Sequence, residues 1–281
     1  KKLLRNHAHD SIGGCNSDAT NRDILHRLEQ TEQLCHSLWN LVVKTLAAAC
    51  VQDGDLLIFN PLATPTQRVV ITTLYNRADN IALTYQGQPL SFDVLERDIL
   101  PGGTAISLTA EGECETPLPP YYRWHVAVKT PVLPPIGYLT VNVEEDPAPF
   151  LASEKIKGSE IENAHYRLSL DAGTLTLHDK RSGRRIPSFF TFEDCADAGD
   201  SYDFSPLAGD APTRCSNFTL VDGVKTPLVE KLTVEATMRL PQDLASRQDT
   251  ARTPLSIRLV CELRHDDPNL YVEASLENSH C

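Results

Sequence analysis

The chain has 281 residues, of which 41% are apolar and 23% charged, a composition typical of a soluble folded protein rather than a disordered one. The chain has 26 basic and 38 acidic residues, so its formal net charge is −12, which argues against a surface that binds nucleic acid. No run of 18 apolar residues occurs, which excludes a membrane-spanning helix. We therefore expect neither nucleic acid nor membrane as a partner.

The eight cysteines form no CxxC pair and no tight cluster. This spacing predicts reduced thiols of a cytoplasmic protein rather than the disulfide framework of a secreted one. The chain begins without methionine and contains only Met238. A mature natural N-terminus and a piece of a longer protein explain this equally well.

Residues 20 to 50 carry the only long helical pattern. Apolar residues recur every 3.5 positions along it, at Ile24, Leu28, Cys35, Leu38, Val42 and Ala49. Thr20 and Asp23 resemble a capping box, and the predicted helix covers about residues 18–51. A stripe this wide needs helical partners, which we expect upstream of Lys1. In their absence we expect Ile24, Leu28, Leu38 and Val42 to be exposed, or covered by a second copy in a symmetric homodimer.

Short β-branched and aliphatic runs, separated by proline and glycine, follow from Gly54 onward. In the first half they predict strands at 56–59, 69–75, 81–85, 105–108, 121–129 and 138–143. An acidic, proline-rich stretch at 144–149 then reads as a linker. Beyond it we expect strands at 164–170, 174–178, 228–240, 255–264 and 270–276.

These patterns predict a mainly β protein with one long N-terminal helix. A small antiparallel β-sandwich would be followed by part of a larger, supersandwich-type β-sandwich. The predicted division is 1–53 for a loop and the helix, 54–145 for the small sandwich, and 150–281 for the start of the large one.

The densest polar cluster runs from Asn6 to Gly14 and contains His7, His9 and Asp10. Imidazole and carboxylate groups both suit zinc, so this loop is a candidate metal site. The alternative is an exposed loop that precedes a helix. HAHDSIGG also resembles the metal-binding run of metallo-β-lactamase-like hydrolases, but the aspartate comes one residue too early and the strands before it are missing.

A second cluster, Gly199 to Pro206, places acidic and small residues beside Tyr202 and Phe204. Carboxylates next to a flat ring are what a sugar-facing loop offers. An ordinary solvated acidic loop has the same composition, so both readings stay open at this point.

Five segments in this order resemble family 38 glycoside hydrolases, the α-mannosidases: NHAHDSIGGCNSD, LLIFNPLATP, LPPIGYLTV, IENAHYRLSLDAGTLTLHDKRSG and GDSYDFSP. The likeness is closest to the bacterial branch that includes mannosylglycerate hydrolase, which acts on 6-phosphomannosyl-glycerate. The family's α/β catalytic barrel would lie upstream of Lys1, and the chain would be a fragment from the middle of the enzyme.

The resemblance implies roles for three residues. His9 resembles a ligand of the family's single divalent metal, zinc or a similar ion, and Asp10 resembles its neighbour that binds sugar hydroxyls. Tyr202 resembles a tyrosine that reaches the −1 sugar. His7 has no counterpart in the family, and a structural role is expected for it.

The resemblance also implies retaining hydrolysis of an α-mannoside, which can carry a phosphate. Both catalytic carboxylates are expected upstream, so no catalytic residue is assigned in this chain, which alone should neither hold zinc tightly nor hydrolyse mannosides. The alternative function is that of a self-contained β-sandwich module that binds carbohydrate but catalyses no reaction. Such a module has no need of the His9–Asp10 loop ahead of a helix.

Overall fold

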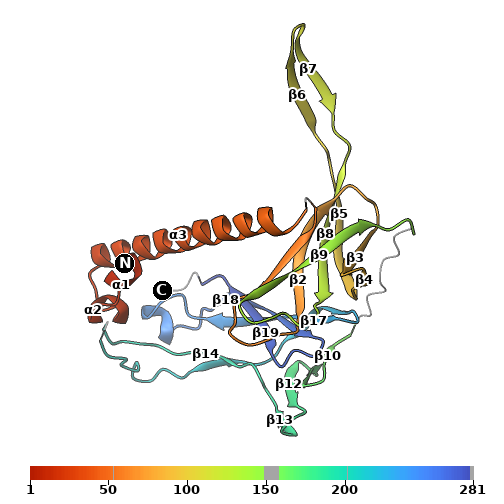
Figure 1. Ribbon diagram of the computed structural model, residues 1–281. Helices are drawn as coiled ribbons and strands as arrows, with labels where there is room; N and C mark the ends of the chain where they lie inside the picture. The colour runs from red at the N-terminus through yellow and green to blue at the C-terminus, as the bar shows by residue number, and fades with distance from the viewer. Residues whose placement is uncertain (53, 149–157, 201, 279–281) are drawn as a thin grey trace.

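The structure is a computed structural model that describes residues 1–52, 54–148, 158–200 and 202–278. It begins with two short helices, α1 (Lys2–Arg5) and α2 (His9–Gly13), followed by the long helix α3 (Asp18–Cys50). Figure 1 shows α1 and α2 folded back beside the first turns of α3. The helix starts where the sequence predicts it, but its N-cap is Ser17, whose hydroxyl accepts a 3.3 Å hydrogen bond from the Thr20 N–H. The predicted Thr20–Asp23 capping box is therefore wrong, because both residues lie inside the first two turns.

The apolar stripe of α3 is exposed along most of its length. Leu28, Leu38 and Val42 are 41%, 61% and 53% exposed, as predicted. Ile24 departs from that prediction, since it is only 6% exposed. Its turn of α3 is covered by the N-terminal segment, where the buried Asn6 donates a hydrogen bond to the Ile24 carbonyl.

The first half of the β region is a sandwich of two antiparallel sheets. One sheet has the order β1-β9-β3-β4 and the other β2-β8-β5. Their strands are β1 (Leu56–Asn60), β2 (Val69–Asn76), β3 (Ile81–Tyr85), β4 (Gln88–Pro89), β5 (Phe92–Leu100), β8 (Tyr121–Lys129) and β9 (Gly137–Glu145). Alternate residues of β8, Trp124, Val126 and Val128, are fully buried against Leu83 and Val141 of the facing sheet. Alternate residues of a strand point to the same face, and Ala127, which lies between Val126 and Val128, is buried in a separate cluster.

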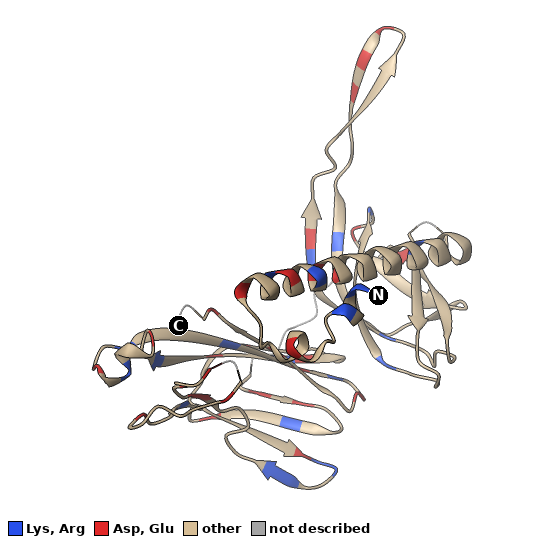
Figure 2. Ribbon diagram, turned by 90° about the vertical axis from the view of Figure 1, so that its left-hand side faces the viewer, with Lys and Arg blue, Asp and Glu red and all other residues tan. Residues whose placement is uncertain are grey.

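Between β5 and β8 the chain forms a hairpin that stands away from the sandwich. Its strands are β6 (Thr104–Thr109) and β7 (Gly112–Pro117), which pair only with each other among the described strands. Figure 1 shows the hairpin projecting from the end of β5 and β8, and Figure 2 shows acidic residues near its tip. We call this hairpin the arm.

The second half is another sandwich, built from the sheets β10-β11-β12-β13 and β16-β17-β18-β19. The strands are β10 (Glu160–Glu162), β11 (Tyr166–Asp171), β12 (Thr174–Asp179), β13 (Arg184–Ile186), β16 (Thr219–Lys225), β17 (Val229–Leu240), β18 (Thr253–Arg264) and β19 (Leu270–Leu276). Between them lies a separate pair, β14 (Phe192–Asp194) and β15 (Thr213–Cys215), and a 3₁₀ turn (Ala245–Gln248) precedes β18.

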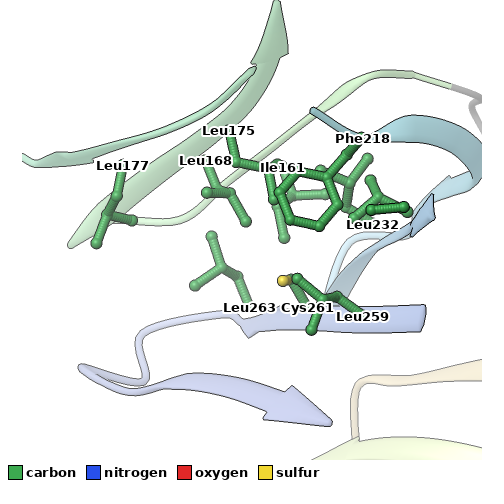
Figure 3. Packing of buried hydrophobic residues seen from close by; sticks show 11 residues of the cluster. Ile161, Leu168, Leu175, Leu177, Phe218, Leu232, Leu259, Cys261 and Leu263 are labelled. Carbon is green, nitrogen blue, oxygen red and sulfur yellow. The ribbon is translucent and has the colours of Figure 1, made fainter. Parts of the chain in front are cut away.

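The core of this second sandwich is a layer of aliphatic side chains between the two sheets. Figure 3 shows Leu168, Leu175 and Leu177 of the smaller sheet facing Leu263 and Cys261 of the larger one. All five are buried, and Phe218, just before β16, closes the cluster. Burial of such a layer is the main favourable contribution to the fold.

The mainly β architecture with one long N-terminal helix is confirmed. The predicted linker differs in detail, because Glu144 and Glu145 are the last residues of β9, while residue 149 lies outside the described residues. No helix in the described part of the chain has the length and apolar character needed to cross a membrane.

Candidate functional site

The histidine-containing loop of the sequence forms α2 and the turn before it. His9 is the first residue of α2, and its Nε2 lies 3.3 Å from Oδ1 of Asp10. Both side chains face solvent, with 94% of His9 and 57% of Asp10 exposed. His7 lies in the preceding turn and is also exposed. His9 and Asp10 are thus neighbours, and the polar atoms of both side chains are accessible.

Asn6 fixes this loop against α3. Its amide nitrogen donates a 3.2 Å hydrogen bond to the carbonyl of Ile24, and its amide oxygen accepts a 2.9 Å bond from Arg27 Nη1. The side chain is 96% buried only because both of its polar ends are bonded. Asn6 therefore places the backbone of His7 and His9 at the start of the long helix.

His9 and Asp10 supply only part of a metal shell. An imidazole and a carboxylate are suitable zinc donors, but a protein zinc site uses three or four such ligands. No group of three or more histidine, cysteine or acidic side chains with metal-binding geometry occurs within the described ranges. His9 and Asp10 are thus two of the three or four donors that such a site uses, and no chemical step is assigned to a metal in this chain.

The second predicted cluster forms a loop between β14 and β15. Oδ1 of Asp197 accepts 2.9 Å hydrogen bonds from the N–H groups of Gly199 and Ser205, and these bonds hold the pKa of the Asp197 carboxyl below its usual range. Oδ1 of Asp200 accepts a 2.8 Å bond from the N–H of Tyr202. The acidic side chains therefore shape the loop through its backbone.

This bonding leaves the aromatic rings of the loop turned outward. Tyr202 is 73% exposed and Phe204 61% exposed. Exposed rings on a loop held in shape by its own carboxylates can stack on a flat partner such as a sugar face. In Figure 1 the loop reaches toward the end of the molecule where α1 and α2 lie. No hydrogen bond or ion pair joins Tyr202 to His9 or Asp10 within the part of the chain that the structure describes.

The base of the loop is held by an ionic cluster that the sequence does not reveal. Arg247 Nη1 lies 2.6 Å from Asp194 and 3.7 Å from Asp210, with 12% of its side chain exposed. Asp210 also accepts a 2.8 Å hydrogen bond from the N–H of Ala196. These residues are spread over more than 50 positions, and no short motif connects them. A charged cluster of this kind becomes visible only once the strands are placed.

A cavity of about 400 Å³ lies beside this cluster. Its floor is formed by buried apolar residues of β17 and β18, Met238, Leu255 and Ile257, and its rim includes Asp197 and Arg247. Among the acids that line it, Glu193 pairs with Arg214, Asp194 pairs with Arg247, and Asp197 accepts bonds from the loop backbone. Among the described residues of the two predicted clusters, no hydrogen bond joins a hydroxyl or thiol to a histidine that could act as its base.

Comparison with known proteins relates this chain to carbohydrate enzymes. Residues 161–280 match the family described as "Glycosyl hydrolases family 38 C-terminal domain". The matched stretch contains Tyr202 and its loop, whereas His9 and Asp10 lie before it. No curated protein matches the chain.

Two solved structures share the fold of nearly the whole chain. The first is an α-mannosidase from Enterococcus faecalis V583, with a TM-score of 0.77 and 18% sequence identity. The second is described as a protein in glycosyl hydrolase family 38 from Enterococcus faecalis, with a TM-score of 0.75 and 18% identity. Each match covers 99% of this chain but only 36% and 38% of the longer chain, respectively.

At this level of identity the two structures establish the fold alone, and they extend the likeness from the second sandwich to the first sandwich and α3. The likeness in sequence to this family is confined to the second sandwich and the chain end that follows it. Residues 161–280 are similar in sequence to the C-terminal domain of glycosyl hydrolase family 38.

Proposed function

We propose that this chain is part of a retaining α-mannosidase of glycosyl hydrolase family 38. The observation that carries the proposal is the match of residues 161–280 to that family's C-terminal domain. The shared fold over 99% of the chain supports it, because the first sandwich and the long helix occur together with the second sandwich in an α-mannosidase.

In this proposal the chain contributes the outer part of the active site. His9 would be one ligand of a divalent metal, zinc or a similar ion, whose other ligands come from residues outside this chain. Asp10 would accept hydrogen bonds from sugar hydroxyls, and Tyr202 would contact the sugar in the −1 subsite. The exposure of all three side chains supports these roles, since groups that meet ligands or other domains must be accessible.

The catalytic carboxylates would also come from outside residues 1–281. Retaining hydrolysis needs a nucleophile and an acid/base about 5–5.5 Å apart, and no residue here is assigned to either role. A bound metal would supply positive charge beneath the sugar hydroxyls. What this chain's own residues do is orient the sugar: the Asp10 carboxylate and the Tyr202 hydroxyl hold it while the bond is broken elsewhere.

We further propose that the protein is a bacterial, cytoplasmic enzyme. The specific candidate for its α-mannoside substrate is 2-O-(6-phosphomannosyl)-glycerate. The support is the resemblance of the five sequence segments to that branch of the family. The test compares hydrolysis of this compound with hydrolysis of its form without phosphate. Equal kcat/KM values for the two compounds would show that the enzyme does not recognise the phosphate, and the proposed α-mannosidase activity would stand.

The proposed activity is tested with two proteins, residues 1–281 alone and the full-length protein that contains them. The full-length protein should hydrolyse an activated α-mannoside with retention of configuration, which NMR of the released sugar detects. Residues 1–281 alone should show no turnover and no stoichiometric zinc after dialysis. Saturable mannose binding by residues 1–281, with an inactive full-length protein, would instead establish a carbohydrate-binding module. Turnover by residues 1–281 alone would place the catalytic carboxylates within this chain and contradict the account.

A further inference from the structure

The arm is exposed along its whole length. Every residue of β6 and β7 is exposed, including Ile106 at 66% and Leu108 at 84%. A single two-stranded hairpin is marginally stable in water without further strands or a covering surface. The arm therefore lacks, within the described residues, the packing that a hairpin of this kind requires.

The neck of the arm is built by close backbone packing. A Cβ atom on Gly102 would lie 2.1 Å from the carbonyl oxygen of Pro119, so only glycine permits the two connecting segments to approach here. Next to it, the N–H of Leu118 donates a 3.0 Å hydrogen bond to the carbonyl of Gly103. The neck therefore restricts the path of the two segments from which the arm projects in Figure 1.

The hydrogen bond at the neck also tells which backbone groups of the arm point outward. Pairs in an antiparallel ladder alternate between hydrogen-bonded and non-hydrogen-bonded. Since Gly103 and Leu118 are a bonded pair, the next pair, Thr104 with Pro117, is not, and the alternation continues to Thr109. On β6 the even-numbered residues, Ile106 and Leu108 among them, therefore present their N–H and C=O groups to the free edge.

The two free edges of the arm differ in charge. The outward-facing residues of β7 are Glu113, Glu115 and Pro117, and both carboxylates and proline are devices that prevent edge-to-edge pairing. The outward-facing residues of β6 are uncharged. The segment 101–120 contains no lysine or arginine that could neutralise the acids of β7. The arm is therefore protected on one edge and open on the other.

We propose that the open edge of β6 pairs with β6 of a second copy of this chain. The pairing is antiparallel about a two-fold axis through Ser107, so that Ile106 lies opposite Leu108 of the partner subunit. This register brings four apolar side chains together on one face of a four-stranded sheet β7-β6-β6-β7. It also keeps the carboxylates on the two outer strands, roughly 14 Å apart at about 4.8 Å per strand. Pairing through β7 would instead bring Glu113 and Glu115 of both copies side by side, which like-charge repulsion disfavours.

Sedimentation equilibrium of the full-length protein that contains this chain tests the pairing. Ile106→Lys places a charge on the open edge, and we expect it to raise the dimer dissociation constant at least tenfold. Val132, which is 61% exposed in the loop after β8, provides the matched control, and Val132→Lys should leave the constant within twofold. A monomer at every concentration, or a dimer that Ile106→Lys leaves intact, would overturn the proposal.

Disulfide cross-linking tests the register. Ser107 would form a non-hydrogen-bonded pair with Ser107 of the partner subunit, with Cα atoms about 4.5 Å apart, which a disulfide can span. Cys114 lies opposite Ser107 within the arm and must be removed, so the variant is Ser107→Cys with Cys114→Ser. Oxidation should give a covalent dimer whose bridge, mapped by mass spectrometry, joins the two introduced cysteines. Cross-linking of wild-type protein through Cys114 would show that the β7 edges meet, and cross-linking through Cys35 would show a dimer across α3; either result overturns the proposal.

Discussion

The carboxylate of Asp93 in β5 accepts a 2.6 Å hydrogen bond from the backbone N–H of Leu228, 135 residues further along the chain. Asp93 is 95% buried, and the contact joins the first sandwich to the second. An apolar cluster surrounds it, formed by Val69 and Ala127 of the first sandwich and Leu228 and Val229 of the second. The two sandwiches are therefore joined by a packed and hydrogen-bonded interface rather than by the connecting segment alone.

Asp93→Ala should destabilise the protein measurably. It leaves the buried N–H of Leu228 without its acceptor, which costs about 1–3 kcal/mol. The matched control is Asp98→Ala in the same strand, because Asp98 pairs with Arg123 at the surface, where the two side chains are 35% and 42% exposed. Such surface pairs are worth about 0–1 kcal/mol. Urea denaturation should give a clearly larger loss for Asp93→Ala, and equal losses would show that the Leu228 contact does not hold the sandwiches together.

The loop that carries Tyr202 should be ordered across the neutral range and open only in acid. The pKa of the Asp197 carboxyl lies below its usual range because two backbone N–H groups bond its charged form. An aspartate whose pKa is lower in the folded state stabilises the fold fully at any pH above its unfolded-state pKa of about 3.9. This stabilisation is lost as the pH falls through the folded-state pKa. Hydrogen exchange at Gly199 and Ser205, corrected for the intrinsic rate, should therefore show constant protection from pH 8 to about 5 and a decrease below about 4.

Hydrogen exchange also tests whether the bonds of Asp197 order this loop or whether any acidic side chain in the loop has the same effect. Asp197→Ala should remove the protection of the Gly199 and Ser205 amides at every pH. Asp203→Ala, a change of the same type in the same loop, should leave it unchanged, because the hydrogen bond found for Asp203 among the described residues of the loop comes from its backbone N–H. If both variants exchange like the wild type, the carboxylate of Asp197 does not hold the loop.

Cys261 should react with alkylating agents only when the second sandwich opens. It is fully buried in the core, and burial raises the pKa of its thiol to about 12. At pH 8 the fraction of Cys261 present as thiolate is then about a thousandfold below that of an ordinary thiol. The surrounding core also keeps the reagent from reaching the sulfur. Cys114, exposed on the arm, is the internal control and should be labelled first. Mass spectrometry of a labelling time course that finds the two cysteines modified together would contradict the packing of this core.

The sequence predicts the elements whose periodicity is uninterrupted. The long helix and most core strands belong to this group, because a stripe or an alternation of apolar residues over many positions has few alternative interpretations. Strand β5 escapes prediction, since Asp93, Glu96, Arg97 and Asp98 break the alternation and a bulge lies between Val94 and Glu96. Burial of Asp93 against Leu228 explains the first of these charges, and it depends on a contact 135 residues away. Strand β7 escapes for another reason: an exposed hairpin strand has no buried face and therefore no apolar pattern.

The candidate site is only partly readable from the sequence. His9, Asp10 and Tyr202 stand out as residue types beside glycines and small residues, and their placement in the active site stays a prediction. The groups that position the two loops, Asn6 with Arg27 and Arg247 with Asp210, lie 21 and 37 positions apart in the sequence. They give no local signal because their roles arise from tertiary contacts.

The most direct test of the central claim compares His9→Ala with His7→Ala in the full-length protein that contains this chain. If His9 is a metal ligand of an α-mannosidase, His9→Ala should lose most of its bound zinc and its turnover of an activated α-mannoside. Removal of one ligand of a four-ligand shell has this effect. His7→Ala, two residues earlier and also exposed, should keep both. Full metal content and full turnover in His9→Ala would show that this loop is not part of the active site.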